Sequence, residues 1–219
     1  MQLLYQDDDI LVCVKPVGMD CEPGPGSLPE ALGGEIYPVH RLDRNVGGVM
    51  VYARTRPAAA ALSAAIQAGT VKKEYLAIVH GTPEQPQGTL EDLLWKDSRS
   101  NKVFPVTRMR RGVKAAKLDY RALACLEGRT LVQVRLHTGR SHQIRVQFAS
   151  RKWPLVGDHK YGSRDGSTSP ALFSFRLTLP HPKTHAKMQF TALPDGSVWA
   201  PFRFAFPSLA QDNPEPIET

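Results

Sequence analysis

One carboxylate in this sequence stands among cations. Asp43 lies in the run His40–Gly48 (HRLDRNVGG), with Arg41 and Arg44 close on either side. Neighbouring guanidinium groups favour the ionised form of a carboxylate, which can then act as a nucleophile or as a base. The glycine pair that follows allows close backbone approach or unusual torsion angles. The run predicts either a catalytic carboxylate at a strand edge or a surface cluster of ion pairs, and composition alone does not separate the two.

A tyrosine follows two lysines in the segment Lys72–Val79 (KKEYLAIV). On a strand, Lys73 and Tyr75 share one face, and the alternate residues Leu76 and Ile78 share the other. If the second face packs inward, Tyr75 lies on the accessible face beside the lysines. A tyrosine there can stack on a nucleobase or take part in proton transfer. The simpler interpretation is a strand tyrosine with its hydroxyl group in water.

A third polar run, residues 136–145 (LHTGRSHQIR), passes from a strand through a glycine into a predicted helix over 141–152 with Ser141 as N-cap. It gathers Arg140, His142 and Arg145 near the start of that helix. A helix N-terminus with cationic side chains favours anions, so the run predicts recognition of phosphate or carboxylate groups. The two histidines of the run are five residues apart across a turn, and the spacing fixes no third ligand. We therefore expect no metal site.

Most of the excess positive charge lies in one stretch. The chain has 28 Lys and Arg against 21 Asp and Glu, a net charge of +7. Residues 96–117 carry eight cations and a single acid, Asp97. Such a run is either a solvated face or a surface that follows the phosphates of a nucleic acid.

Short strands and two helices must position these residues. We expect strands near 3–14 (two, around an acidic turn), 48–53, 71–79, 117–126, 130–136, 172–179 and 187–193, and helices over 57–68 and 141–152. Residues 15–38 are rich in Gly and Pro and predict a long surface loop, and residues 82–114 are polar and poorly periodic. The hairpin-like links favour an antiparallel or mixed sheet rather than regular βαβ units.

Composition limits the class of protein. The chain has 219 residues, of which 42% are apolar and 22% charged, as in ordinary folded domains. No apolar stretch approaches the length of a transmembrane helix, and the acidic start does not resemble a signal peptide. Three cysteines without a C-x-x-C motif predict neither a disulfide framework nor a zinc site, and favour the cytoplasm.

Together these segments resemble the RluA-type family of RNA pseudouridine synthases. The resemblance rests on HRLD at 40–43, on K-E-Y-L-A-I-V-H-G at 73–81, on T-G-R-S-H-Q-I-R at 138–145 and on P-L-V-G-D-H-K-Y-G at 154–162. The four motifs occur in the family's order, and the likeness covers roughly residues 3–194. It implies an α+β fold with a mixed, mostly antiparallel central sheet and flanking helices and loops. It also implies one catalytic domain, which we place over 1–210, before a polar tail over 211–219. Many members of the family carry an S4-type RNA-binding domain in front of the catalytic domain, and because the likeness begins near Leu3 we expect none here.

The resemblance also implies roles for residues. Asp43 would begin the conversion of uridine to pseudouridine, by attacking the base or the sugar or by abstracting a sugar proton. Tyr75 would stack on the flipped uracil and assist the proton transfer from C5, and Arg145 would pair with Asp43. RNA-binding residues would be Arg41, Lys73, Arg140 and His142. The reaction is a redox-neutral isomerisation that needs no cofactor or metal.

The expected partner is a loop or bulge of ribosomal or transfer RNA, because the target base must leave its stack to be reached. We expect a monomer that binds neither DNA nor membranes. Departures from the family's pattern at Val46, Gln147 and Phe173 motivate an alternative, a non-catalytic RNA-binding or assembly protein on the same fold. A metal-dependent nuclease would need clustered carboxylates or histidines, and the acids here are scattered.

Overall fold

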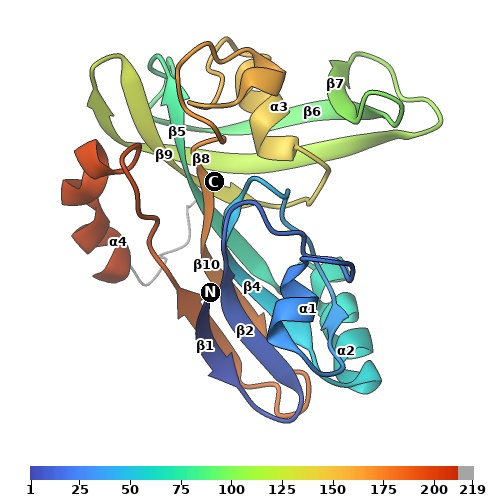
Figure 1. The fold of residues 1–219 in the computed structure, drawn as a ribbon. Coiled ribbons are helices and arrows are strands. Elements are labelled where there is room, and N and C mark those ends of the chain that lie inside the picture. Colours follow the sequence, from blue (N-terminus) through green and yellow to red (C-terminus); the bar gives the residue numbers. More distant parts are fainter. Residues whose placement is uncertain (212–219) are drawn as a thin grey trace.

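The computed structural model describes residues 1–211 and places eleven strands in one sheet (Figure 1). Its main path runs β1-β2-β4-β10-β5-β9-β8-β6-β7, with β3 beside β4 and β11 beside β10. Only the β4–β10 pair is parallel among these strands. The expected α+β fold with a mixed, mostly antiparallel sheet is confirmed. The strands are β1 (Gln2–Gln6), β2 (Ile10–Lys15), β3 (Tyr37–Pro38), β4 (Gly47–Ala53), β5 (Lys72–His80), β6 (Gln87–Asp97), β7 (Lys102–Val106), β8 (Val113–Leu126), β9 (Arg129–Leu136), β10 (Leu172–Pro180) and β11 (Lys187–Thr191).

The helix α2 (Arg56–Gln67) forms where the alanine-rich segment predicts it. Thr55 caps its start by accepting a hydrogen bond from the Ala58 backbone N–H at 3.2 Å. Gly69 follows its end with φ of 72°, a conformation that glycine adopts without a Cβ clash. Leu62, on the inner face of this helix, is buried against apolar residues of β2, β4 and β10. The helix thereby covers one face of the half of the sheet that contains the N-terminus.

The β8–β9 hairpin explains why its strands could be predicted. Its two turn residues, Glu127 and Gly128, both have positive φ, 49° and 69°. A two-residue loop with two positive φ values is the type I′ turn, whose twist matches that of the flanking strands. The strands then pair from Leu126 and Arg129 back to Leu118 and Leu136, with one register shift.

The polar stretch 82–114 is more ordered than its sequence indicates, because it contains β6 and β7. The alternation in β6 is hidden: Leu90 and Leu94 point into the core, and Asp92 occupies the inward position between them. Asp92 is tolerated there because it pairs with Arg151 at 2.9 Å and accepts a hydrogen bond from Gln147 at 2.8 Å. Gln147, one of the departures from the family's pattern, is fully buried and packs against β6, where it binds Asp92.

The predicted loop 15–38 also holds regular structure. It contains the helix α1 (Leu28–Leu32), whose N-cap Ser27 accepts a hydrogen bond from the Glu30 backbone N–H at 3.3 Å, and ends in β3. A five-residue helix is too short to show a helical period in its sequence. Leu28 is fully buried and fixes this segment to the core.

The end of the described chain packs on the other face of the sheet. The 3-10 helix η2 (Ala200–Ala205) and the helix α4 (Phe206–Gln211) place Trp199, Phe202 and Phe206 over β5, β9 and β10. The predicted polar tail begins at the last residue of α4, and residues 212–219 lie outside the described residues. None of the helices within residues 1–211 is both long and apolar enough to cross a membrane.

Candidate active site

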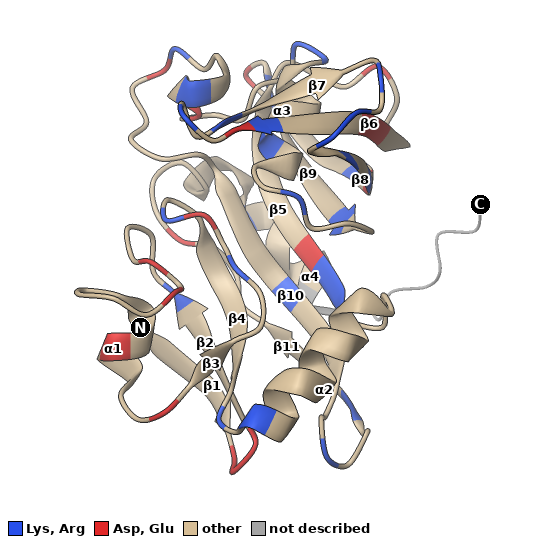
Figure 2. Ribbon diagram, turned by 90° about the vertical axis from the view of Figure 1, so that its right-hand side faces the viewer, with Lys and Arg blue, Asp and Glu red and all other residues tan. Residues whose placement is uncertain are grey.

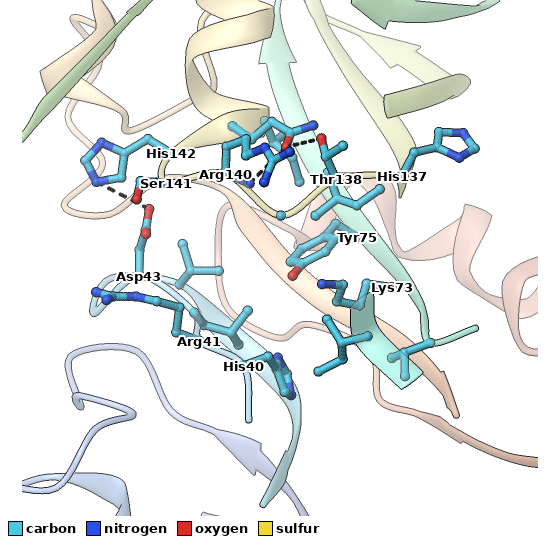
Figure 3. A pocket seen from close by; sticks show the side chains of 18 of the residues that line it. His40, Arg41, Asp43, Lys73, Tyr75, His137, Thr138, Arg140, Ser141 and His142 are labelled. Atoms are coloured by element: carbon cyan, nitrogen blue, oxygen red, sulfur yellow. Dashed lines mark hydrogen bonds and ion pairs between the residues drawn. The ribbon is translucent and has the colours of Figure 1, made fainter. Parts of the chain in front are cut away.

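A cavity of about 790 Å³ opens where the segments singled out in the sequence meet (Figure 3). Its walls come from the loop before β4, the end of α2, the start of β5, the end of β9 and the first turn of the helix α3 (Gln143–Ala149). The sheet order brings these segments together although they are far apart in the sequence. All seven residues expected to act in catalysis or RNA binding line the cavity. Arg145 lies on α3, and the other six lie on loops or strands. The seven are Arg41, Asp43, Lys73, Tyr75, Arg140, His142 and Arg145.

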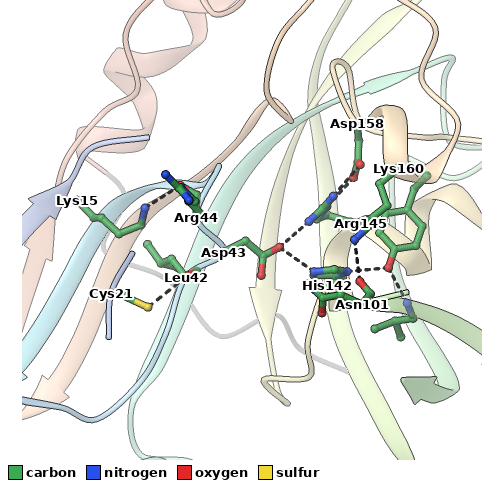
Figure 4. A network of polar contacts seen from close by, with 12 residues as sticks. Lys15, Cys21, Leu42, Asp43, Arg44, Asn101, His142, Arg145, Asp158 and Lys160 are labelled. Atoms are coloured by element: carbon green, nitrogen blue, oxygen red, sulfur yellow. Dashed lines mark hydrogen bonds and ion pairs between the residues drawn. The ribbon is translucent and has the colours of Figure 1, made fainter. Parts of the chain in front are cut away.

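Asp43 sits on a loop that is anchored on both sides. Leu42 and Val46 are buried in the core, and the Val46 N–H donates to the Asp43 carbonyl oxygen at 2.9 Å. Lys15, which is fully buried at the end of β2, donates from Nζ to the carbonyl oxygens of Arg44 at 3.0 Å and Met19 at 2.7 Å (Figure 4). Burial lowers the pKa of Lys15 to about 8. The ammonium group thus ties the loop that carries Asp43 to the loop after β2.

The glycine pair after this loop permits a close approach of β10. Gly48 has φ of 126°, and a Cβ atom there would overlap the backbone of Ser174. A Cβ on Gly47 would lie 3.2 Å from the Lys15 carbonyl oxygen. The glycines therefore allow the parallel β4–β10 pairing, and with it the placement of the Asp43 loop, as the sequence indicated.

The cation that contacts Asp43 comes from α3. Arg145 donates from Nη1 to Oδ2 of Asp43 at 2.8 Å, and from Nε and Nη2 to the two oxygens of Asp158 at 2.7 and 2.8 Å (Figure 4). Burial disfavours the cation, but the bonds and charges of Asp158 and Asp43 outweigh it and raise the pKa of Arg145. Arg41 and Arg44, the sequence neighbours of Asp43, instead pair with Glu22 and Asp20. The sequence neighbours of Asp43 are thus not the cations that contact it, whereas the pairing with Arg145, which the resemblance implied, does form.

The start of α3 differs from the expected helix. The helix begins at Gln143, and its N-cap is His142 in a left-handed conformation with φ of 51°, rather than Ser141. The Gln143 side-chain oxygen accepts hydrogen bonds from the Thr138 hydroxyl at 2.7 Å and from the Arg140 N–H at 3.0 Å. These bonds bend the loop so that the His142 side chain faces Asp43, with Nε2 3.9 Å from Oδ2.

Tyr75 and Lys73 form the β5 wall of the cavity. Tyr75 is only 6% exposed, so the expected open position on the strand surface is wrong, because both faces of this central strand are covered. Burial, with the charge of Asp43, raises the pKa of Tyr75 well above its usual range. Burial also lowers the pKa of Lys73. The cavity therefore presents a neutral phenol and a poorly hydrated ammonium group on one wall.

Two more of the expected RNA-binding residues lie at the rim. Arg41 and Arg140 are exposed, and Arg140 Nε donates to the Ala115 carbonyl oxygen at 2.8 Å. Ala115 belongs to the start of β8, within the basic stretch 96–117. That stretch forms the β6–β7 hairpin and the start of β8, and Lys and Arg segments are numerous on this part of the molecule (Figure 2). Arg140 thus links the rim of the cavity to the start of β8, within the basic stretch.

Two residues near Asp43 had no role assigned from the sequence. Asp158 is 1% exposed and holds Arg145 from the side opposite Asp43. The Tyr161 hydroxyl lies 2.7 Å from Nδ1 of His142. Both belong to the run 154–162, whose glycines and aspartate were the available signal, but nothing in its spacing relates it to Asp43.

The fold and the site define a class of protein. A family model described as RNA pseudouridylate synthase matches residues 9–150, which include Asp43, Tyr75 and Arg145. The chain therefore belongs to the RNA pseudouridylate synthase family, a class of RNA-modifying isomerases.

The curated proteins that this chain resembles in sequence are also described as pseudouridine synthases. The chain is 33% identical over 210 residues to the uncharacterized RNA pseudouridine synthase YlyB of Bacillus subtilis, covering 88% of this chain and 68% of that protein. It is 34% identical over 227 residues to the ribosomal large subunit pseudouridine synthase D of Vibrio cholerae, covering 90% of this chain and 69% of that protein. The chain thus spans about two thirds of the length of these relatives.

Solved structures show the same fold. The human RNA pseudouridylate synthase domain containing 4 superposes with a TM-score of 0.74 at 23% identity, covering 95% of this chain and 92% of that one. The human RNA pseudouridylate synthase domain containing 1 superposes with a TM-score of 0.75, also at 23% identity, over 89% of this chain and 83% of that one.

Proposed function

We propose that this chain isomerises uridine to pseudouridine in structured RNA, that Asp43 begins the reaction, and that no cofactor is needed. The observation that carries the proposal is the different hydrogen bonding of the two oxygens of the Asp43 carboxylate. Its Oδ2 accepts a hydrogen bond from Arg145, whereas no residue among 1–211 donates to its Oδ1. One oxygen is thus held and the other is left to react, on the wall of a cavity that Tyr75 shares.

The reaction uses this arrangement. The C1′–N1 bond of the nucleotide breaks, a C1′–C5 bond forms, the proton on C5 is released and N1 takes up a proton from solvent, so that atoms and electrons balance without an oxidant. Asp43 can start it as a nucleophile at the base or the sugar, or as a base toward a sugar proton, and each route needs an ionised carboxylate. The hydrogen bond from Arg145 aims the carboxylate.

Tyr75 would contact the uracil. Its ring lies in the β5 wall, where a flipped base can stack on it. Its raised pKa keeps the hydroxyl protonated, so Tyr75 would relay the C5 proton as a neutral phenol rather than remove it as a phenolate.

The basic surface would hold the RNA. Arg41, Lys73 and Arg140 line the cavity, and Arg140 contacts the start of β8, which belongs to the basic stretch 96–117. Phosphate contacts of this kind position a substrate without reading its sequence. We further propose a loop or bulge of ribosomal or transfer RNA as substrate, residues 1–210 as one catalytic domain acting as a monomer, and a cytoplasmic location.

Substitution of the carboxylate tests the proposal. Formation of the C1′–C5 bond releases the hydrogen of C5, so RNA labelled with tritium at C5 of uridine reports turnover by tritium release. Wild-type protein in the presence of EDTA should release tritium from bulk cellular RNA, and Asp43→Asn should release none. Asp20→Asn, an exposed acid paired with Arg44, is the matched control and should retain activity.

The same assay separates the alternatives. Tritium release by a folded Asp43→Asn variant would disprove the role of Asp43. RNA binding without tritium release by the wild-type protein on any cellular RNA would favour the non-catalytic RNA-binding protein instead. Mapping pseudouridine in RNA from cells with and without the gene would then identify the modified uridine.

A further inference from the structure

A second side chain besides Arg145 points at Oδ2 of Asp43. His142 Nε2 lies 3.9 Å from this oxygen, and the His142 side chain is 9% exposed against 25% for Asp43 (Figure 4). The separation is too long for a hydrogen bond. Active-site hydrogen bonds in ligand-free proteins are often long and shorten when the substrate binds. A closure of about 1 Å would make His142 a direct donor to Asp43.

The hydrogen bonds around Tyr161 determine which nitrogen of His142 carries the proton. The Tyr161 oxygen accepts a hydrogen bond from the Val103 N–H at 2.8 Å and lies 2.7 Å from Nδ1 of His142. Since its own hydroxyl hydrogen has no other acceptor within residues 1–211, we assign Tyr161 as the donor to Nδ1. Nδ1 then accepts, and in a neutral imidazole the proton is on Nε2, the nitrogen that faces Asp43.

The imidazole is also held neutral. Burial lowers the pKa of His142 to about 4, and the cations Arg145 and Lys160 act in the same direction against the carboxylates Asp43 and Asp158. A neutral N–H donor adds a hydrogen bond to the carboxylate without placing a second positive charge beside Arg145.

The same histidine is linked to the basic hairpin. Val103, which donates to Tyr161, lies in β7, and Lys160 beside Tyr161 donates from Nζ to the Asn101 carbonyl oxygen at 2.8 Å in the β6–β7 turn. The short 3-10 helix η1 (His159–Tyr161) therefore connects the hairpin to His142. A displacement of the hairpin would reach Asp43 through this helix.

We propose that His142 is a positioning residue for Asp43, whose Nε2–H is set by Tyr161 to donate to Oδ2 when RNA is bound, so that Oδ1 is the reacting oxygen. This inference rests on the proposed function of Asp43. It gives His142 a different role from the direct RNA contact that the sequence suggested. Because Tyr161 contacts both Val103 of the β6–β7 hairpin and His142, the hairpin helps to fix the position of His142 beside Asp43.

Two substitutions of His142 separate positioning from structure. Asparagine tolerates the left-handed conformation and can keep a partner for Tyr161 near Nδ1, but it has no group at the place of Nε2. Glutamine reaches the place of Nε2 with an amide N–H and gives up the Tyr161 contact. We expect kcat in the tritium assay to fall on the order of 100-fold for His142→Asn and less than about 10-fold for His142→Gln, with similar KM values for RNA.

A purely structural histidine predicts the reverse order, because Asn preserves both the backbone conformation and the Tyr161 contact. Equal kcat values for the two variants, or a more active Asn variant, would overturn the proposal. Asp43→Asn is measured beside them: if it is inactive, a failure concerns His142 alone, and if it is active, the proposed function itself has failed.

A measurement on the wild-type protein covers the case in which a variant does not fold. The ¹⁵N shifts of the His142 imidazole at neutral pH should show a protonated Nε2 and an unprotonated Nδ1. The opposite tautomer would overturn the proposal whatever the variants do.

Discussion

At the scale of the residue, the two oxygens of Asp43 have different surroundings. Oδ2 faces Arg145 at 2.8 Å and His142 at 3.9 Å, and Oδ1 has no donor among residues 1–211. A partly exposed carboxylate without such partners would rotate between equivalent states. Holding one oxygen removes that freedom before the substrate arrives, which is the part of catalysis that orientation supplies.

Tyr75 offers a residue-scale prediction. In Tyr75→Phe the ring that would stack on uracil remains, and only the hydroxyl is lost. Since a positioned proton-transfer group contributes about 10²–10⁴ to a rate, we expect kcat to fall in that range while KM for RNA changes little. Tritium release under single-turnover and steady-state conditions measures both.

A matched control is Tyr120→Phe. The Tyr120 hydroxyl is also partly buried, but it donates to the Gln85 carbonyl oxygen outside the cavity at 3.2 Å. This variant should keep wild-type kcat. An equal loss in both variants would show that the hydroxyls act through stability and would contradict the role of Tyr75.

The residues of the site could be predicted only in part. The four motifs indicated Asp43, Tyr75 and Arg145, and the structure brings the three to one cavity. No role was assigned to Lys15, because nothing in a sequence shows that a buried lysine will bind three carbonyl oxygens. Such contacts depend on loops that meet only in the folded chain.

At the scale of the element, the β4–β10 pair is the contact that fixes the Asp43 loop. In Gly48→Ala the new Cβ would overlap the Ser174 backbone, and φ of 126° would be strained as well. We expect the free energy of unfolding to fall by more than about 3 kcal/mol, measured by urea denaturation.

Gly128→Ala is the control for torsional strain alone. Gly128 has φ of 69°, and nothing lies within 4 Å of the place that a Cβ atom would take. Its cost should be about 1 to 2 kcal/mol. A similar loss of stability in the two variants would mean that the close approach of β10 is not the reason why position 48 requires glycine.

The β6–β7 hairpin gives a second element-scale prediction. Arg108 and Arg111 are exposed in the loop after β7. If each neutralises one RNA phosphate, replacing both by Ala should make the negative slope of log K for RNA binding against log salt concentration shallower by about 1.4 to 1.8. Lys183→Ala with Lys187→Ala, at the β10–β11 hairpin, removes the same charge from exposed positions and should leave the slope unchanged. An equal change in both would indicate a general effect of net charge.

Elements were predictable where the local pattern is regular. The alanine-rich α2 and the type I′ hairpin β8–β9 carry their own signals, and both formed with ends within a few residues of those expected. The strands β6 and β7 were missed because Asp92 interrupts the apolar alternation and its compensating partners, Gln147 and Arg151, lie on and just after α3. Tertiary pairing made a strand from a sequence that looks like a loop.

At the scale of the whole molecule, one aspartate ties together distant parts of the chain. Asp7, in the β1–β2 turn, accepts hydrogen bonds from the backbone N–H groups of Asp9 and Ile10 and from the Tyr5 hydroxyl, each at 2.8 Å. Its Oδ2 also lies 2.8 Å from Nε2 of His181, after β10. The contact joins the β1–β2 turn to the β10–β11 hairpin.

This cluster makes acid stability a property of the fold that can be measured. Burial opposes ionisation of Asp7, but the donated hydrogen bonds outweigh it and lower its pKa to about 2, from 3.8. A carboxyl whose pKa is lower in the folded state stabilises the protein above pH 3.8 and loses that contribution as the pH falls toward 2. The shift corresponds to about 2 kcal/mol of unfolding free energy. Asp7→Asn should lack this part of the acid dependence, whereas Asp8→Asn, the exposed neighbour, should keep it. Urea denaturation of the three proteins between pH 2 and pH 5 measures the difference, and parallel curves for wild type and Asp7→Asn would contradict it.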